Sequence, residues 1–162
     1  MAQGRTVGRF KRNITAGPSV TVMPTSLRHR ARIVTLQTLY ELEFAANSET
    51  SILERNLKEK ELPREVATFA GSLVSGVIAN KQLLDNTIGR FATAFPVDQL
   101  AAMDRNILRL ALFEITVSKE VPPKVAINEA VELAKEFGAD TSPKFINGVL
   151  GSVISEIKKS AQ

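Results

Sequence analysis

Apolar residues recur at intervals of three and four along most of the chain, which is the period of amphipathic helices. The clearest case begins at Pro123, a residue that suits the first turn of a helix, and ends at Gly138, a common helix stop. One broad face of this stretch is apolar and carries Ala126, Ile127, Ala130, Leu133, Ala134 and Phe137. The opposite face is charged, so we predict a half-buried helix.

A second amphipathic helix is predicted directly after the first. Ser142 suits its N-cap and Pro143 its first helical position. The apolar stripe of this helix consists of Ile146, Val149, Leu150, Val153, Ile154 and Ile157. Phe145 lies at the edge of the stripe, beside Lys144. We therefore expect its ring to be partly exposed and available for stacking.

The first helical stretch covers about residues 26–46, with Ser26 as its cap. Its predicted core face consists of Ile33, Leu36, Leu39, Tyr40 and Phe44. Basic residues crowd its first turn, where the helix dipole disfavours cations, so an anionic partner would relieve the repulsion. A frayed helix start with solvated arginines is the alternative.

Two stretches follow. A short helix over about residues 51–61 is indicated by the capping-box spacing of Ser51 and Glu54. A longer helical stretch covers residues 63–88, where apolar residues keep the period of three and four. Its glycines permit close helix contacts or a kink, and they are Gly71, Gly76 and Gly89.

The segment 97–116 is helical by composition, and its second half has almost no polar surface. That pattern predicts the central and most buried helix of the fold. Arg109 lies inside the apolar run, where an unpaired charge would be very costly. We expect it to pair with Glu114 or with an acid from another helix, which is a structural role.

No strand-length alternation, phosphate-binding glycine loop or hydrolase motif is present. We therefore predict an all-α fold with a single helical domain over residues 26–162. Residues 1–25 hold glycines and prolines without a period, which predicts a flexible basic extension. Met23 is also a candidate start of translation, and the sequence leaves both interpretations open.

The composition of the chain restricts the classes of function that it can have. The chain has no cysteine and a single histidine, His29, which excludes disulfides and thiolate zinc sites and disfavours histidine chemistry. Glu129, Glu132 and Lys135 share a solvated helix face, where salt-bridging is a better interpretation than acid–base catalysis. We predict no enzyme activity, no metal and no cofactor. No apolar run reaches the ~20 residues of a membrane span, so we expect a cytoplasmic protein with no membrane partner.

Charge is distributed unevenly. Residues 1–32 contain seven basic side chains and no acid, whereas the remainder contains 14 basic and 17 acidic side chains. A basic arm on a mildly acidic body is typical of proteins that bind a polyanion such as nucleic acid. A solubilising tail fits the charge alone equally well.

Three blocks of sequence, in order, resemble the family of the bacterial transcription antitermination factor NusB. They are RHRARIVTLQTLYELE, DRNILRLALFEI and VPPKVAINEAVELAKEFGADTSPKFINGVL, and the resemblance spans residues 27–153. It implies two packed three-helix bundles. It also implies binding to boxA-type single-stranded RNA of ribosomal RNA transcripts, together with a small-subunit ribosomal protein acting as NusE. The pair would then load onto RNA polymerase and suppress termination.

The resemblance also implies roles for individual residues. The RNA-binding arm matches Arg28, His29, Arg30 and Arg32, and the closing hairpin contributes Lys144, Phe145 and Asn147. The ribosomal-protein surface would include Tyr40 and Asp104. Arginines that contact phosphates and aromatics that stack on bases are the usual means of holding single-stranded RNA.

Three features depart from the family pattern. His29 stands where an arginine is frequent, Ile33 replaces a frequent acid, and the 22 residues before Met23 exceed the usual arm. The alternatives are an RNA-binding module like that of ribosomal RNA cytosine methyltransferases, which would need a further catalytic domain, and a helical scaffold for protein interactions. Homodimers occur among NusB-like proteins, and the sequence leaves monomer and homodimer open.

Overall fold

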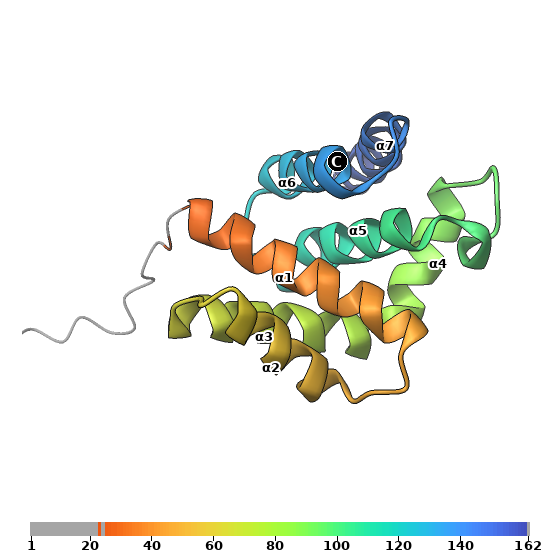
Figure 1. Ribbon diagram of the computed structural model, residues 1–162. Helices are drawn as coiled ribbons and strands as arrows, with labels where there is room; N and C mark the ends of the chain where they lie inside the picture. Colours follow the sequence, from red (N-terminus) through yellow and green to blue (C-terminus); the bar gives the residue numbers. More distant parts are fainter. Residues whose placement is uncertain (1–22, 24, 162) are drawn as a thin grey trace, which may run out of the picture.

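The computed structural model describes residue 23 and residues 25–161, and within them it contains seven α-helices and no strand (Figure 1). The helices are α1 (Thr25–Phe44), α2 (Glu49–Glu59), α3 (Arg64–Ala79), α4 (Lys81–Phe91), α5 (Ala102–Phe113), α6 (Pro123–Phe137) and α7 (Ser142–Ser160). The all-α prediction is confirmed. In this part of the chain no helix has the length and apolar character that crossing a membrane requires. Apart from Met23 and Thr25, the extension predicted over residues 1–25 lies outside the described residues.

Two groups of helices pack against each other. In one group α2 and α3 both contact α1, and in the other α5, α6 and α7 contact one another, with α4 against α5 and α7. Figure 1 shows α2 and α3 below α1, and α6 and α7 above α5. α1 lies directly on α5, so these two helices join the groups. The predicted pair of packed three-helix bundles is confirmed.

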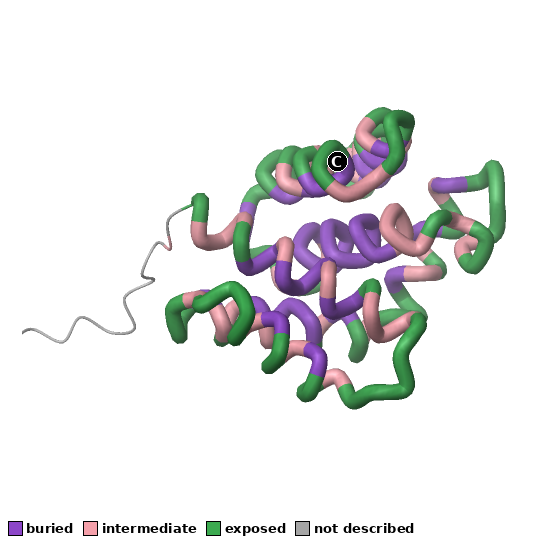
Figure 2. Tube along the Cα trace, in the orientation of Figure 1, coloured by how far each residue is buried: buried purple, intermediate pink, exposed green. Residues whose placement is uncertain are grey.

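α5 is the most buried helix, as predicted. Every residue from Asn106 to Phe113 is buried, and Figure 2 shows this helix in purple at the centre of the molecule. Its side chains belong to one apolar cluster that also includes residues of α1, α3, α4, α6 and α7. A smaller cluster lies between α1 and α3 and consists of Ala31, Val34, Val66 and Ala70.

The core face predicted for α1 is partly wrong. Leu36 and Leu39 are buried, but Tyr40 and Phe44 are 37% and 68% exposed. α1 packs against α3 on one side and α5 on the other, so its buried arc is wide and includes Ala31, Arg32, Val34, Thr35 and Thr38. Both threonine hydroxyls donate to carbonyls one turn earlier, at 2.9 and 2.8 Å, which satisfies them inside the core.

Three predicted caps are also wrong. Ser142 is already the first residue of α7, and Thr141 stands at the N-cap. Ser48, not Ser51, caps α2, because its hydroxyl accepts the backbone N–H of Ser51 at 3.2 Å. α1 begins at Thr25, so Ser26 lies inside its first turn.

The stretch predicted as one helix over residues 63–88 is two helices. Asn80 leaves helical geometry, and its side-chain amide donates to the carbonyl of Gly76 at 2.7 Å. Gly76 itself permits a close contact: a Cβ there would lie 2.1 Å from the ring of Phe113, so only glycine lets α3 and α5 approach this closely.

The segment 97–116 contains more than one element. Val97–Gln99 forms a 3₁₀ turn (η1), and α5 follows. A π-helical turn over Glu114–Ser118 (η2) continues from α5 and ends at Lys119, whose φ is 54°. The π turn places Glu114 on the buried side of the chain.

Candidate functional site

The first turns of α1 present two arginines at the surface. Arg30 is exposed, and its guanidinium donates to the carbonyl of Lys60 at the end of α2 at 3.1 Å. Arg28 is half-buried, and its Nε donates to the carbonyl of Met23 at 3.0 Å. Neither arginine has a carboxylate within ion-pair distance among the described residues. Both charges are therefore available to an anion.

His29 faces α6 and lies between two acids. Its Nδ1 is 2.9 Å from Glu129 Oε2, and its Nε2 is 3.6 Å from Glu136 Oε2. The imidazole is 29% exposed, so it remains at the edge of the surface. This contact fixes the start of α1 against the second half of α6.

Arg32 does not lie on the surface that the sequence predicted for it. Its side chain is 2% exposed and forms a forked ion pair with Glu114, with Nε 2.9 Å and Nη2 2.7 Å from the carboxylate oxygens. Its Nη1 is 3.6 Å from Glu129, which therefore bridges Arg32 and His29. Arg32 is therefore not a direct RNA contact, because its guanidinium is used inside the protein to hold α1 to η2 and α6.

The first turn of α7 supplies the second part of the predicted RNA site. Lys144 and Asn147 are exposed, whereas Phe145 is half-buried and packs against the main core. The Ser142 hydroxyl accepts the backbone N–H of Ala139 at 2.9 Å, which orders the connection from α6. Phe145 is thus partly exposed, as predicted.

The two parts of the predicted site meet through α6. No hydrogen bond or ion pair joins α1 to α7 among residues 25–161. Instead, His29 reaches Glu136 in the last turn of α6, and the short connection 138–141 leads from there to α7. The arm and the closing hairpin therefore lie on neighbouring elements.

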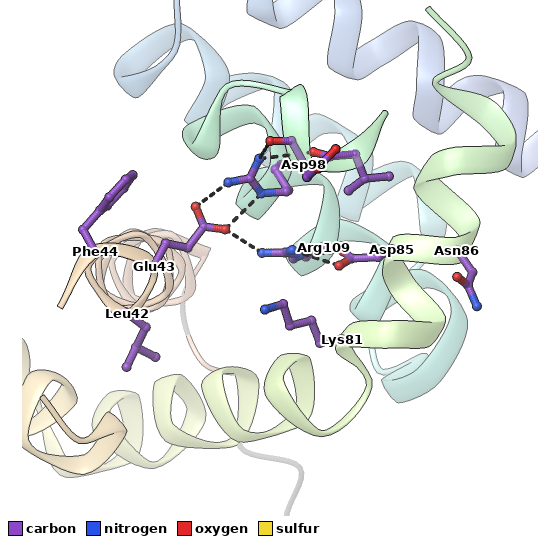
Figure 3. A pocket seen from close by; sticks show the side chains of 10 residues that line it. Leu42, Glu43, Phe44, Lys81, Asp85, Asn86, Asp98 and Arg109 are labelled. Atoms are coloured by element: carbon purple, nitrogen blue, oxygen red, sulfur yellow. Dashed lines mark hydrogen bonds and ion pairs between the residues drawn. The ribbon is translucent and has the colours of Figure 1, made fainter. Parts of the chain in front are cut away.

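The other end of α1 borders a cleft of about 760 Å³ (Figure 3). Its walls come from the end of α1, the start of α4, η1 and α5. The lining residues include Leu42, Glu43, Phe44, Lys81, Asp85, Asp98, Arg105 and Arg109. Nothing in the sequence pattern indicated this cleft, because its residues come from four separate segments.

A partly buried ion network lines the cleft. Glu43 accepts from Arg105 at 2.6 Å and from Arg109 at 2.9 Å, and Arg109 also forms a forked pair with Asp85 at 2.7 and 2.9 Å. Figure 3 shows Glu43 between the two guanidinium groups. The prediction that Arg109 pairs with an acid of another helix is confirmed, and its alternative partner Glu114 instead binds Arg32.

The network shifts the pKa values of Glu43 and Arg109. Burial alone would raise the pKa of Glu43, but the hydrogen bonds and charges of Arg105 and Arg109 outweigh it and hold that pKa below its ordinary value. Burial would lower the pKa of Arg109, but Asp85 and Glu43 raise it above its ordinary value. Ion pairs thus join α1, α4 and α5 at this cleft.

Aromatic side chains lie beside this network. The rings of Tyr40 and Phe44 are 5.0 Å apart at 57°, and Phe44 borders the cleft. Asp104, the second residue predicted to contact a partner, is half-buried, and its Oδ1 has no hydrogen-bond partner among the described residues. Exposed rings next to a charged cleft are suited to contact with a protein.

The chain is similar in sequence and in fold to proteins of one family. The NusB family model matches residues 29–155. The transcription antitermination protein NusB of Dehalococcoides mccartyi is 48% identical over 138 residues, which cover 85% of this chain and 96% of that protein. The structure of T. maritima NusB superposes with a TM-score of 0.74 at 33% identity, over 80% of this chain and 91% of that one.

A second solved structure has the same fold. It is a crystal structure of antitermination factors NusB and NusE in complex with double-stranded RNA. One of its chains superposes with a TM-score of 0.75 at 23% identity, over 82% of this chain and 98% of that one.

Proposed function

The chain belongs to the NusB family, as its three sequence blocks predicted, and we propose that it is an RNA-binding transcription antitermination factor. Its ligand is a boxA-type single strand of ribosomal RNA transcripts. The observation that carries this proposal is the pair of surface arginines, Arg28 and Arg30, which have no acidic partner among the described residues. They flank His29, which contacts Glu136 in the last turn of α6, just before the connection to Lys144 and Phe145.

Each group at this site has a separate task. Arg28, Arg30 and Lys144 neutralise phosphates, which supplies most of the affinity and makes it depend on salt. The solvent-facing side of Phe145 stacks on a base, and the amide of Asn147 donates and accepts hydrogen bonds at a base edge. His29 contacts RNA only at the rim, because Glu129 and Glu136 hold its ring.

A small-subunit ribosomal protein acting as NusE is the proposed protein partner, and the complex then joins RNA polymerase. Tyr40 and Phe44 are the proposed anchors, since exposed aromatic rings beside a polar rim are typical of interface centres. Asp104 contributes the carboxylate at that surface. The proposal puts the RNA and the protein at opposite ends of α1.

Titration of a boxA-like single strand at several salt concentrations tests the RNA site. Phe145→Ala should weaken binding by ~1–3 kcal/mol if the ring stacks on a base. Phe145→Leu is the matched control, because it keeps apolar packing against the core but removes the aromatic face. If Phe145→Leu binds RNA like the unaltered chain and Phe145→Ala only lowers thermal stability, the ring is a core residue and the stacking role is wrong.

The partner surface needs its own test. Asp104→Lys should leave RNA affinity unchanged and weaken association with the ribosomal protein, because charge reversal at an interface is unfavourable. The reverse result would refute this surface. Absent or salt-independent binding of the single strand by the unaltered chain would refute RNA binding itself.

A further inference from the structure

A groove of about 600 Å³ follows the outer face of α7, separate from the cleft at the end of α1. It begins at Asn147, within the proposed RNA site, and ends at Lys159. Phe91 at the end of α4 forms its side wall. The residues between its ends are Gly148, Gly151, Ser152, Ser155 and Glu156. The groove thus leads out of the RNA site along the helix.

The two glycines have no packing reason to be there. A Cβ at Gly148 or at Gly151 would meet nothing within 4 Å, in contrast to Gly76, where Phe113 fills that space. Glycine is unfavourable in the interior of a helix, so two of them on an open face call for another explanation. Close approach of a ligand to the helix backbone supplies one.

The charges along the groove favour an anion. Lys159 lines its end, Lys158 is the residue next to it, and Lys144 lies about one helical turn before Asn147 at its start. All three lysines are exposed. At 100° per residue they fall on the same side of α7 as the two glycines. The groove's one lining acid, Glu156, is neutralised by Arg90 of α4 at 2.6 Å. The guanidinium of Arg90 also lies 5.2 Å from the ring centre of Phe91.

We propose that this groove is a second section of the RNA path. A single strand that leaves Phe145 and Asn147 continues along α7 to Lys158 and Lys159, a distance of about 22 Å for 15 helical residues. Its backbone lies against the glycines, and the lysines and the Ser155 hydroxyl bind phosphates without reading sequence. This inference rests on the proposed RNA-binding function and extends the length of RNA that the protein contacts.

The test compares two single strands and two substitutions. One strand is boxA-like, and the other carries about eight further nucleotides at each end, within the ~4–16 that one binding fold covers. Gly151→Glu places a negative charge in the groove, and Gly151→Gln is its neutral match of equal size. Both replace an open helical glycine, so circular dichroism and thermal melting should show intact helices.

The proposal predicts that the extended strand binds the unaltered chain more tightly and with a steeper salt dependence than the short one. Gly151→Glu should weaken binding of the extended strand on the order of tenfold compared with Gly151→Gln, and leave the short strand unaffected. Exchange of both Lys158 and Lys159 for glutamine should likewise weaken binding of the extended strand and remove the additional salt dependence of its affinity.

The proposal for the groove is wrong if both strands bind the unaltered chain with equal affinity and the two Gly151 substitutions do not differ. The short RNA site would then remain as proposed. If neither strand binds, the proposed RNA-binding function is wrong, and the proposal for the groove is wrong as well. If light scattering shows that Gly151→Glu changes self-association but not RNA affinity, the groove is an interface between copies of the chain and the proposal is wrong.

Discussion

The two ends of α1 are anchored by mirrored charge arrangements. At its start, α1 contributes the buried guanidinium of Arg32, and the acids come from η2, directly after α5, and from α6. At its end, α1 contributes the carboxylate of Glu43, and the arginines come from α5. Each anchor joins α1 to the second helix group, so the two groups are held together at both ends of one helix.

What each end leaves exposed differs. The start of α1 presents Arg28 and Arg30, which have no acidic partner in residues 25–161, and its end presents the rings of Tyr40 and Phe44. Residue type alone therefore does not distinguish a structural anchor from a candidate ligand contact: Arg32 and Arg30 are two positions apart, but Arg32 is buried and Arg30 is exposed. Exposed arginines favour binding of a polyanion, whereas exposed aromatic rings favour binding of a protein.

Removal of the anchor at the start of α1 should have the largest effect. Arg32→Ala leaves Glu114 buried without its partner and should lower the free energy of unfolding by ~3–5 kcal/mol, measured by urea denaturation. The double change Arg32→Met and Glu114→Leu removes both charges and should recover much of that loss. An Arg32→Ala variant as stable as the unaltered chain would mean that this end is not anchored by the pair.

The anchor at the other end should respond to pH. Glu43→Gln should cost ~1–3 kcal/mol at pH 7, because Arg105 and Arg109 lose a charged partner. The pKa of Glu43 is lowered in the folded protein, so its stabilisation is complete above the ordinary value of 4.5 and is lost as pH falls below it. Denaturation at several pH values should show that the free energies of unfolding of Glu43→Gln and of the unaltered chain become equal in acid. A difference that stays constant down to pH ~3 would contradict the shift.

The exposed ring at the end of α1 should matter for the partner and little for folding. Phe44→Ala should change the free energy of unfolding by no more than ~0.5 kcal/mol, since the side chain is 68% exposed. It should weaken binding of the ribosomal protein by ~1–2 kcal/mol, measured by calorimetry. Ile157→Ala on α7 is a matched control, 43% exposed, that should affect neither quantity. Partner affinity equal in both variants would place the interface elsewhere.

A single exposed arginine should have the smallest effect. Arg30→Gln should leave stability within ~0.5 kcal/mol and reduce the slope of log affinity for RNA against log salt by about one. Arg55→Gln, which changes an exposed arginine of α2 that pairs with Glu41, should leave the slope unchanged. An identical change in slope for both would indicate a diffuse effect of net charge.

Sequence periodicity predicted a helix well where the helix has a single buried apolar face. α6 and α7 match the prediction within about one residue, because their proline starts and apolar stripes are local signals. α1 is less regular, since packing on two sides buries Thr35 and Thr38 and leaves Phe44 outside. The break at Asn80 was missed because apolar spacing continues across it.

The candidate sites were predictable only in part. Charge and the family resemblance led to the proposal of Arg28, Arg30, Lys144 and Phe145 as RNA contacts, but the same reasoning placed Arg32, which is buried, with them. Its burial depends on Glu114, 82 residues away in the chain, which no local pattern encodes. The cleft and the α7 groove were missed for the same reason, because their walls come from separate helices.

The most direct test of the central claim pairs two variants with two ligands. The double variant Arg28→Gln with Arg30→Gln and the variant Phe44→Ala are each titrated with a boxA-like strand at several salt concentrations, and with the ribosomal protein. We predict that the arginine variant binds RNA more weakly and with a flatter salt dependence but retains the protein, and that Phe44→Ala does the opposite. If both variants lose both ligands equally, the two ends of α1 do not serve separate partners.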